Sequence, residues 1–144
     1  PATYLKGSIR CQWLRGHNYR NARRFMRAIS ARLEKKEKLG LFDYYTLGKL
    51  IHYTTDAFTY AHNDTFPTAL SDHREYEAAL QDHFLEYMKQ DPKVNPKIAG
   101  SVMEAIYSYH REYEAQAANI YTDTRFALNA CCCVLAVLLS NPIF

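Results

Sequence analysis

The sequence predicts an all-α protein, a single-domain bundle of about five helices around an apolar C-terminal helix. Apolar residues recur at three- and four-residue spacing along most of the chain, and no stretch shows the alternation of a half-buried strand. Residues 122–139 are apolar nearly all round, which is typical of a helix at the centre of a bundle. The 144 residues are enough for one compact domain with its own core, so we expect 1–144 to form a single domain.

The first half of the chain holds two predicted helices. We expect a loop or a short helix over residues 1–16, followed by a helix that ends near Gly40. Asp43 is a candidate N-cap for the next helix, because its carboxylate can accept from the free N–H groups of a first turn. The earlier of these two helices carries basic residues mostly away from its apolar stripe: Arg20, Arg23, Arg24, Arg27 and Lys35.

Turn-forming residues separate the helices of the second half. Residues 63–70 have loop composition, and Ser71 or Asp72 can cap the helix that follows. Two Xaa-Pro steps after that helix precede another, expected over 96–118 with the proline in its first turn. The apolar helix over 122–139 completes the bundle.

Charge and hydropathy bear on partners and location. The net charge is +3, and much of the excess lies between Arg15 and Lys38, which indicates a solvated helix face or peripheral contact with an anionic surface. The apolar run from Phe126 to Leu139 is short for a bilayer and contains Asn129, so we expect a buried helix and no transmembrane segment. No signal-like apolar segment follows Pro1, but a processed chain would also lack one, so the compartment stays open. We expect a soluble protein and favour the cytoplasm slightly over secretion.

One short window holds three histidines and two carboxylates that suit a metal site: His52, Asp56, His62, His73 and Glu77. Two His/acid pairs are spaced i,i+4, which on an α-helix leaves the side chains roughly 40° apart and able to hold one cation. His62 follows Asp56 by roughly 240° of helical rotation, so it points away from that pair unless the helix bends or ends. Imidazole and carboxylate ligands without thiolates favour zinc, with manganese or iron as alternatives.

The simplest arrangement of this window has two neighbouring metal ions. His52 and Asp56 hold one ion, and the other is held by the remaining three residues, His62, His73 and Glu77. The first ion then lacks a third protein ligand. His17 is the best candidate, because Gly16 beside it leaves the backbone free to aim the imidazole inward.

The hexapeptide HREYEA occurs twice, at residues 73–78 and 110–115. Each copy offers a His/Glu pair at i,i+4, so either both copies are metal half-sites or one is a chance or relic match on a wet helix face. No further His or Asp surrounds the second copy in the sequence. We therefore expect His110 and Glu114 to lie on a solvated face without a metal ion.

The run LGKLIHYTTDAFTYAHN followed by SDHREYE resembles the zinc-dependent phospholipase C family, whose motif is His-Tyr-x-x-Asp, a His shortly after, and then His-x-x-x-Glu. GHNYRN resembles the Ser-His-Phe-Tyr segment of that family, which supplies a further zinc ligand. The resemblance covers residues 15–80 and implies an all-α bundle. It also implies six zinc ligands in two groups: His17, His52 and Asp56 for one ion, and His62, His73 and Glu77 for the other.

The sequence also departs from the family pattern. Family members hold a third zinc ion with an N-terminal tryptophan and a nearby His, whereas no His precedes His17 and no Asp precedes Gly40 in this chain. Tyr60 and Ala61 stand where members usually have Gln-Pro. We therefore expect two zinc ions rather than three, and we expect the N-terminal part of the family domain to be missing.

The resemblance implies a zinc-dependent phosphodiester hydrolase of the phospholipase C type. Metal-bound hydroxide would attack the headgroup phosphodiester of a phospholipid, and Asp56 would be the catalytic ligand that bridges the two ions. Two alternatives stay open. One is a phosphodiesterase like the related fungal single-strand nucleases, which use Asp where this chain has Glu77; the basic helix and Tyr19 are compatible with nucleic acid. The other is a non-catalytic metal-binding helical domain.

Overall fold

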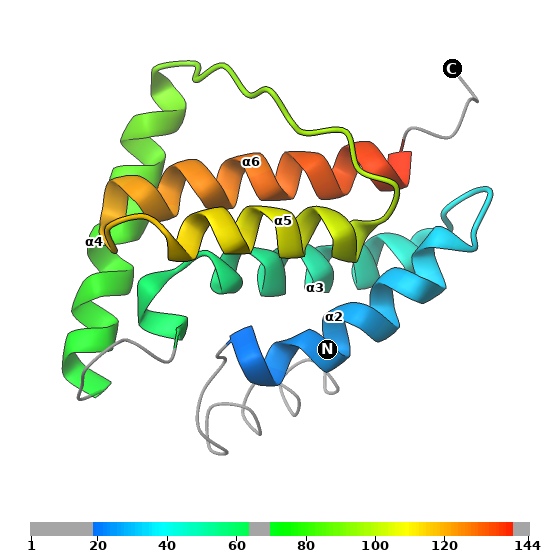
Figure 1. The fold of residues 1–144 in the computed structure, drawn as a ribbon, viewed down its shortest axis with the longest axis horizontal. Helices are drawn as coiled ribbons and strands as arrows, with labels where there is room; N and C mark the ends of the chain where they lie inside the picture. Colours follow the sequence, from blue (N-terminus) through cyan, green and yellow to red (C-terminus); the bar gives the residue numbers. More distant parts are fainter. Residues whose placement is uncertain (1–18, 64–69, 140–144) are drawn as a thin grey trace.

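The computed structural model describes residues 19–63 and 70–139. These residues form five α-helices and a short 3-10 turn, with no strand among them. In chain order they are α2 (Tyr19–Glu34), α3 (Leu41–Ala57), η1 (Tyr60–His62), α4 (Leu70–Lys89), α5 (Val102–Glu114) and α6 (Ile120–Leu139). The predicted all-α, single-domain bundle is confirmed (Figure 1).

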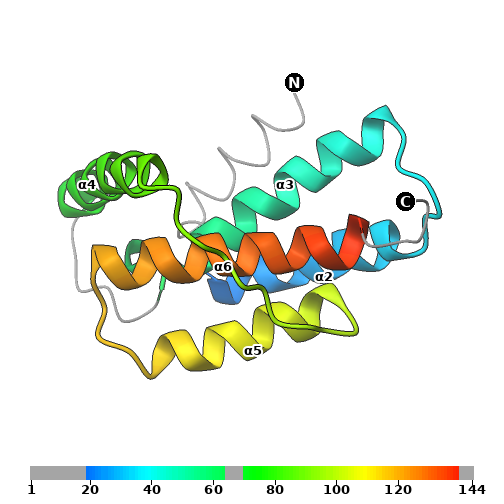
Figure 2. The same ribbon diagram turned by 90° about the horizontal axis from the view of Figure 1, so that it is seen from above.

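The apolar helix α6 lies at the centre of the packing, as the sequence predicts. It packs against α3, α4 and α5, while α2 packs mainly against α3 and α5. Helix α4 crosses one end of the bundle steeply, whereas α3, α5 and α6 run lengthwise (Figures 1 and 2). The core between the helices contains large side chains that are fully buried: Met26, Leu33, Leu50, Phe58, Ile106 and Val134.

Four helix starts differ from the prediction. Helix α4 begins at Leu70, ahead of the predicted caps Ser71 and Asp72, and α6 begins at Ile120 and not at residue 122. Helix α5 begins at Val102 and not at Pro96, because Ser101 is its N-cap and accepts a hydrogen bond from the Glu104 backbone N–H at 3.2 Å. Helix α3 begins at Leu41, so Asp43 lies in its first turn and is not the N-cap. The Asp43 carboxylate still closes this end of α3, because its Oδ2 accepts from the Gly40 backbone N–H at 2.9 Å.

The length of α6 bears on the expectation that no segment of the chain spans a membrane. By length and composition alone, Ile120–Leu139 is apolar enough to cross a bilayer. Half of its apolar window is buried inside the bundle, however, and the core helix of a globular protein meets the same criterion. The observation is therefore weak evidence for a span, and it fits the predicted role of α6 as the central helix.

Candidate metal centre

The end of α3 determines where His62 lies. Tight backbone bonds close the helix, from the Phe58 N–H to the Thr55 carbonyl at 3.1 Å and from the Thr59 N–H to the Asp56 carbonyl at 3.0 Å. The 3-10 turn η1 follows directly and carries His62 at its end. Because the α-helix stops before His62, the side chain turns back toward the last turn of α3. The sequence predicted this orientation only if the helix bent or ended.

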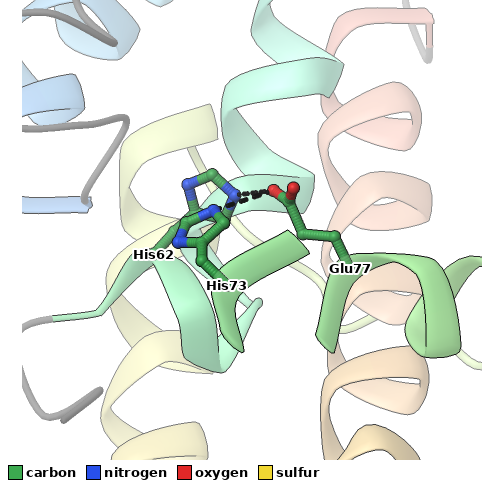
Figure 3. Close-up of side chains that lie close together, drawn as sticks. All are labelled: His62, His73 and Glu77. Atoms are coloured by element: carbon green, nitrogen blue, oxygen red, sulfur yellow. Dashed lines mark hydrogen bonds and ion pairs between the residues drawn. The ribbon is translucent and has the colours of Figure 1, made fainter. Parts of the chain in front are cut away.

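Three side chains from η1 and α4 converge on one point (Figure 3). The Nε2 atoms of His62 and His73 lie 2.7 and 3.0 Å from the same oxygen, Oε1 of Glu77. Potential ligand atoms of all three residues lie within 4.8 Å of one another. His62 is buried, whereas the His73 and Glu77 side chains are 25 % and 44 % exposed. One side of the cluster is therefore closed by protein and the other faces solvent.

Two imidazoles and one carboxylate are a ligand set that fits zinc. Catalytic zinc sites take three protein ligands of these types and leave a fourth position for water or substrate. The hydrogen bond from His62 is the main cause that lowers the pKa of Glu77, so this carboxylate is anionic at neutral pH. The cluster therefore offers a cation a charged oxygen and two nitrogen donors.

The other two ligand candidates of the window extend the same cluster. His52 Nε2 lies 3.3 Å from Asp56 Oδ2, and Asp56 Oδ1 lies 3.9 Å from His62 Nε2. Asp56 is 13 % exposed and stands between the two groups of ligand candidates, while His52 is 42 % exposed. The structure thus brings together five of the six predicted ligands. His17 lies outside the described residues, as do residues 1–16 and most of the predicted loop after Asn63.

Asp123 is a residue of this region that the sequence analysis missed. It is completely buried, and its Oδ2 accepts hydrogen bonds from the Tyr60 backbone N–H at 2.8 Å and the Tyr76 hydroxyl at 2.6 Å. Its Oδ1 accepts from the Tyr113 hydroxyl at 2.6 Å. Asp123 on α6 therefore ties η1 and α4, which carry the cluster, to the centre of the bundle. An acid in a helix that is otherwise nearly all apolar was the available signal.

Burial sets the protonation states around Asp123. Burial raises the pKa of the carboxyl group, and the hydrogen bonds from Tyr113, Tyr60 and Tyr76 oppose that shift by favouring the anion. Burial also raises the pKa values of the Tyr76 and Tyr113 phenols well above their usual range. Both hydroxyls therefore keep the protons that they donate.

The second HREYEA copy has a different environment. His110 is buried, so the expectation of a wet face is wrong for this residue, whereas the Glu114 side chain is 65 % exposed. His110 Nε2 lies 3.1 Å from the Ala57 carbonyl, and its ring stacks on Tyr19 with centroids 3.6 Å apart. Within the described ranges, neither His110 nor Glu114 belongs to a group of three potential metal ligands.

Comparison with known proteins identifies the family of the chain. A family model for zinc-dependent phospholipase C matches residues 4–120, which is more than half of the chain. No curated protein and no solved structure gives a significant match. The matched segment includes the whole candidate metal centre. On the extent of this match, the chain belongs to the zinc-dependent phospholipase C family.

Proposed function

We propose that this chain hydrolyses the headgroup phosphodiester of a phospholipid with zinc. Membership of the family supports a zinc-dependent, phospholipase-like function. The observation that carries the proposal is the convergence of His62, His73 and Glu77, with ligand atoms within 4.8 Å of one another. Zinc bound here would supply a Lewis acid that lowers the pKa of water and neutralises charge on phosphoryl oxygens.

The described residues divide the task of holding zinc. His62, His73 and Glu77 hold one ion, and the anionic Glu77 supplies the charge of that site. Asp56 lies within 4 Å of both His52 and His62, which suits a ligand shared with a second ion. By the family motif, His17 would be the remaining ligand of the second ion. Asp123 is not a zinc ligand in this proposal. Its hydrogen bonds to Tyr60 and Tyr76 position η1 and α4, which carry the ligands.

A substrate comparison tests the proposed function. The zinc-loaded protein should release phosphocholine from phosphatidylcholine and should leave a single-stranded DNA oligonucleotide intact. His73→Ala should reduce lipid hydrolysis by about a hundredfold or more, because it removes one of three ligands from the site. Asp82→Ala is the control, since Asp82 lies on the exposed face of the same helix and belongs neither to the ligand cluster nor to the cavity beside it.

Two outcomes would contradict the proposal. Hydrolysis of DNA with the lipid left intact would assign the chain to single-strand nuclease chemistry. A full complement of zinc with no cleavage of either substrate by the full-length protein would favour a metal-binding helical domain.

A further inference from the structure

A cavity of about 600 Å³ opens beside the ligand cluster, between α3, α4 and α6. Small-molecule sites in proteins span roughly 300–1,000 Å³, so this volume is that of a ligand site. Asp56, His62 and Glu77 form one end of its lining. We call the remainder the α4/α6 groove; its walls are mostly apolar and include Ile51, Leu80, Phe84, Leu85, Leu128 and Cys131.

The polarity of the lining changes with distance from the ligand cluster. On α4 the lining residues Glu77, Leu80 and Phe84 follow one another at helical spacing, so they share one face of the helix. Phe84 lies about 10 Å beyond Glu77 along the helix axis, at 1.5 Å per residue. On α6, Thr124, Leu128 and Cys131 repeat the same order from polar to apolar. The cavity thus has one polar end and a long apolar arm.

The absence of cationic side chains from the described part of the lining favours a hydrocarbon chain over single-stranded nucleic acid as the ligand of this arm. Among the described residues that line it, none is Lys or Arg, and Phe84 is the only aromatic residue besides His62. Single-stranded nucleic acid is held by cationic grooves with several stacking platforms, and the lining offers neither. A hydrocarbon chain needs only apolar walls that remove it from water.

We propose that the α4/α6 groove binds one acyl chain of the phospholipid substrate while the phosphodiester lies at the ligand cluster. This inference rests on the proposed function and specifies its substrate as an amphiphile whose tail enters the protein. Continuity between the groove and the cluster supports it, because both line one cavity. Leu85 is 55 % exposed, so the apolar arm also reaches the surface, where a tail can leave the bilayer.

A series of n-alkylphosphocholines with tails from butyl to dodecyl tests the groove. Calorimetric titration of the zinc-loaded protein, below the micelle concentration of each ligand, gives the dissociation constants. Each methylene that enters the groove should tighten binding roughly three- to fourfold, until the groove is filled. Affinity that does not change with tail length would overturn the proposal.

Leu128→Trp should fill the groove from the α6 side. Leu128 is half-buried and lines the cavity, so a larger side chain takes space from a tail. The variant should weaken dodecylphosphocholine binding by about tenfold or more and leave zinc content and butylphosphocholine binding unchanged. Leu139→Trp is the matched control, because Leu139 lies on the same helix, is 41 % exposed and does not line the groove. Equal effects of the two substitutions would contradict the assignment.

Further measurements keep the inference separate from the proposed function. If circular dichroism shows that Leu128→Trp fails to fold, Phe84→Ala replaces it. Phe84→Ala enlarges the groove, so affinity should keep rising to a longer tail than in the wild type. An unchanged tail length at this limit would count against the groove. Bis(p-nitrophenyl) phosphate, which has no tail, reports the hydrolytic chemistry alone. If alkylphosphocholine affinity depends on tail length but bis(p-nitrophenyl) phosphate is not hydrolysed, the groove is supported and the proposed reaction is overturned. Hydrolysis with tail-independent binding would overturn the groove, as would displacement of dodecylphosphocholine by single-stranded DNA.

Discussion

The two HREYEA copies have the same sequence and different environments. In the copy on α4, His73 and Glu77 meet His62 beside the polar end of the cavity. In the copy on α5, the His110 ring is turned into the core while Glu114 remains 65 % exposed at its side chain. The His/acid pair is present in both, since His110 Nδ1 lies 3.4 Å from Glu114 Oε1. The i,i+4 spacing fixes the pair, and the neighbouring segments decide what the pair contacts.

The third residue of each cluster makes the difference. The α4 copy faces His62, which η1 supplies. The α5 copy faces the backbone carbonyl of Ala57 and the side-chain oxygen of Asn63, which occupy His110 Nε2 at 3.1 and 3.2 Å. A nitrogen that is engaged in the core cannot also bind a cation. The residues around each copy of the motif, and not the motif itself, therefore determine whether its His/Glu pair can bind a metal ion.

The copies nevertheless share one contact. Their tyrosines, at the same position of the hexapeptide, donate to opposite oxygens of Asp123: Tyr113 to Oδ1 and Tyr76 to Oδ2. The carboxylate thus joins α4 to α5 through α6. The repeat has a structural role that both copies keep and a ligand role that we propose for one.

Asp123→Ala should have the largest effect on both copies. Three donors, the Tyr60 N–H and the hydroxyls of Tyr76 and Tyr113, would lose their acceptor, and the free energy of unfolding should fall by about 4 kcal/mol. Urea denaturation of the zinc-free protein measures this loss. Asp82→Ala on the exposed face of α4 is the control and should stay within about 0.5 kcal/mol of wild type. A similar small change for Asp123→Ala would show that the shared carboxylate does not hold the copies.

His110→Ala separates the copies by stability. His110 is buried and packs on Tyr19 and Phe58, so its loss should cost about 2–3 kcal/mol in the absence of zinc. His73→Ala should cost less than about 1 kcal/mol under the same conditions, because its side chain is partly exposed. Thermal and urea unfolding in a chelating buffer measure both. The reverse order would contradict the core role of the second copy.

The two tyrosines sharpen the comparison with one identical change. Tyr76→Phe and Tyr113→Phe each remove one hydrogen bond to a carboxylate and should each cost about 1.5–3 kcal/mol. Only Tyr76→Phe should also weaken zinc binding, by about tenfold, because Tyr76 lies on the helix that carries two ligand candidates. Competition with a chromophoric chelator measures the affinities. Equal zinc affinities in the two variants would show that Asp123 does not position the ligands through α4.

The smallest effect concerns the pH dependence of stability. Burial lowers the pKa of His110 below its usual value near 6.5. The unfolded chain therefore binds the proton first, and this residue reduces stability as the pH falls below about 6.5. One titrating group such as His110 can change the free energy of unfolding by at most about 1.4 kcal/mol per pH unit. His110→Gln should flatten the fall measured by urea denaturation without zinc between about pH 6.5 and 5, and an unchanged fall would show that His110 does not cause it.

Helical periodicity predicted most of the fold, because apolar stripes report directly on burial. The predicted start of α5 at Pro96 was wrong. Proline is compatible with the first turn of a helix, but the helix begins where Ser101 caps the Glu104 N–H. The spacing of the ligand window predicted five side chains that the fold brings together. Asp123 and the burial of His110 escaped prediction for one reason. Most of their partners lie tens of residues away, on other elements of the fold, and no local pattern encodes such contacts.

Zinc content is the most direct test of the ligand cluster. Glu77→Gln and Glu114→Gln make the same change at the same position of the two copies, and both side chains are partly or largely exposed. Elemental analysis after dialysis against limiting chelator should show about one zinc ion fewer per chain in Glu77→Gln and no change in Glu114→Gln. Wild-type zinc in Glu77→Gln, or a loss in Glu114→Gln, would contradict the assignment.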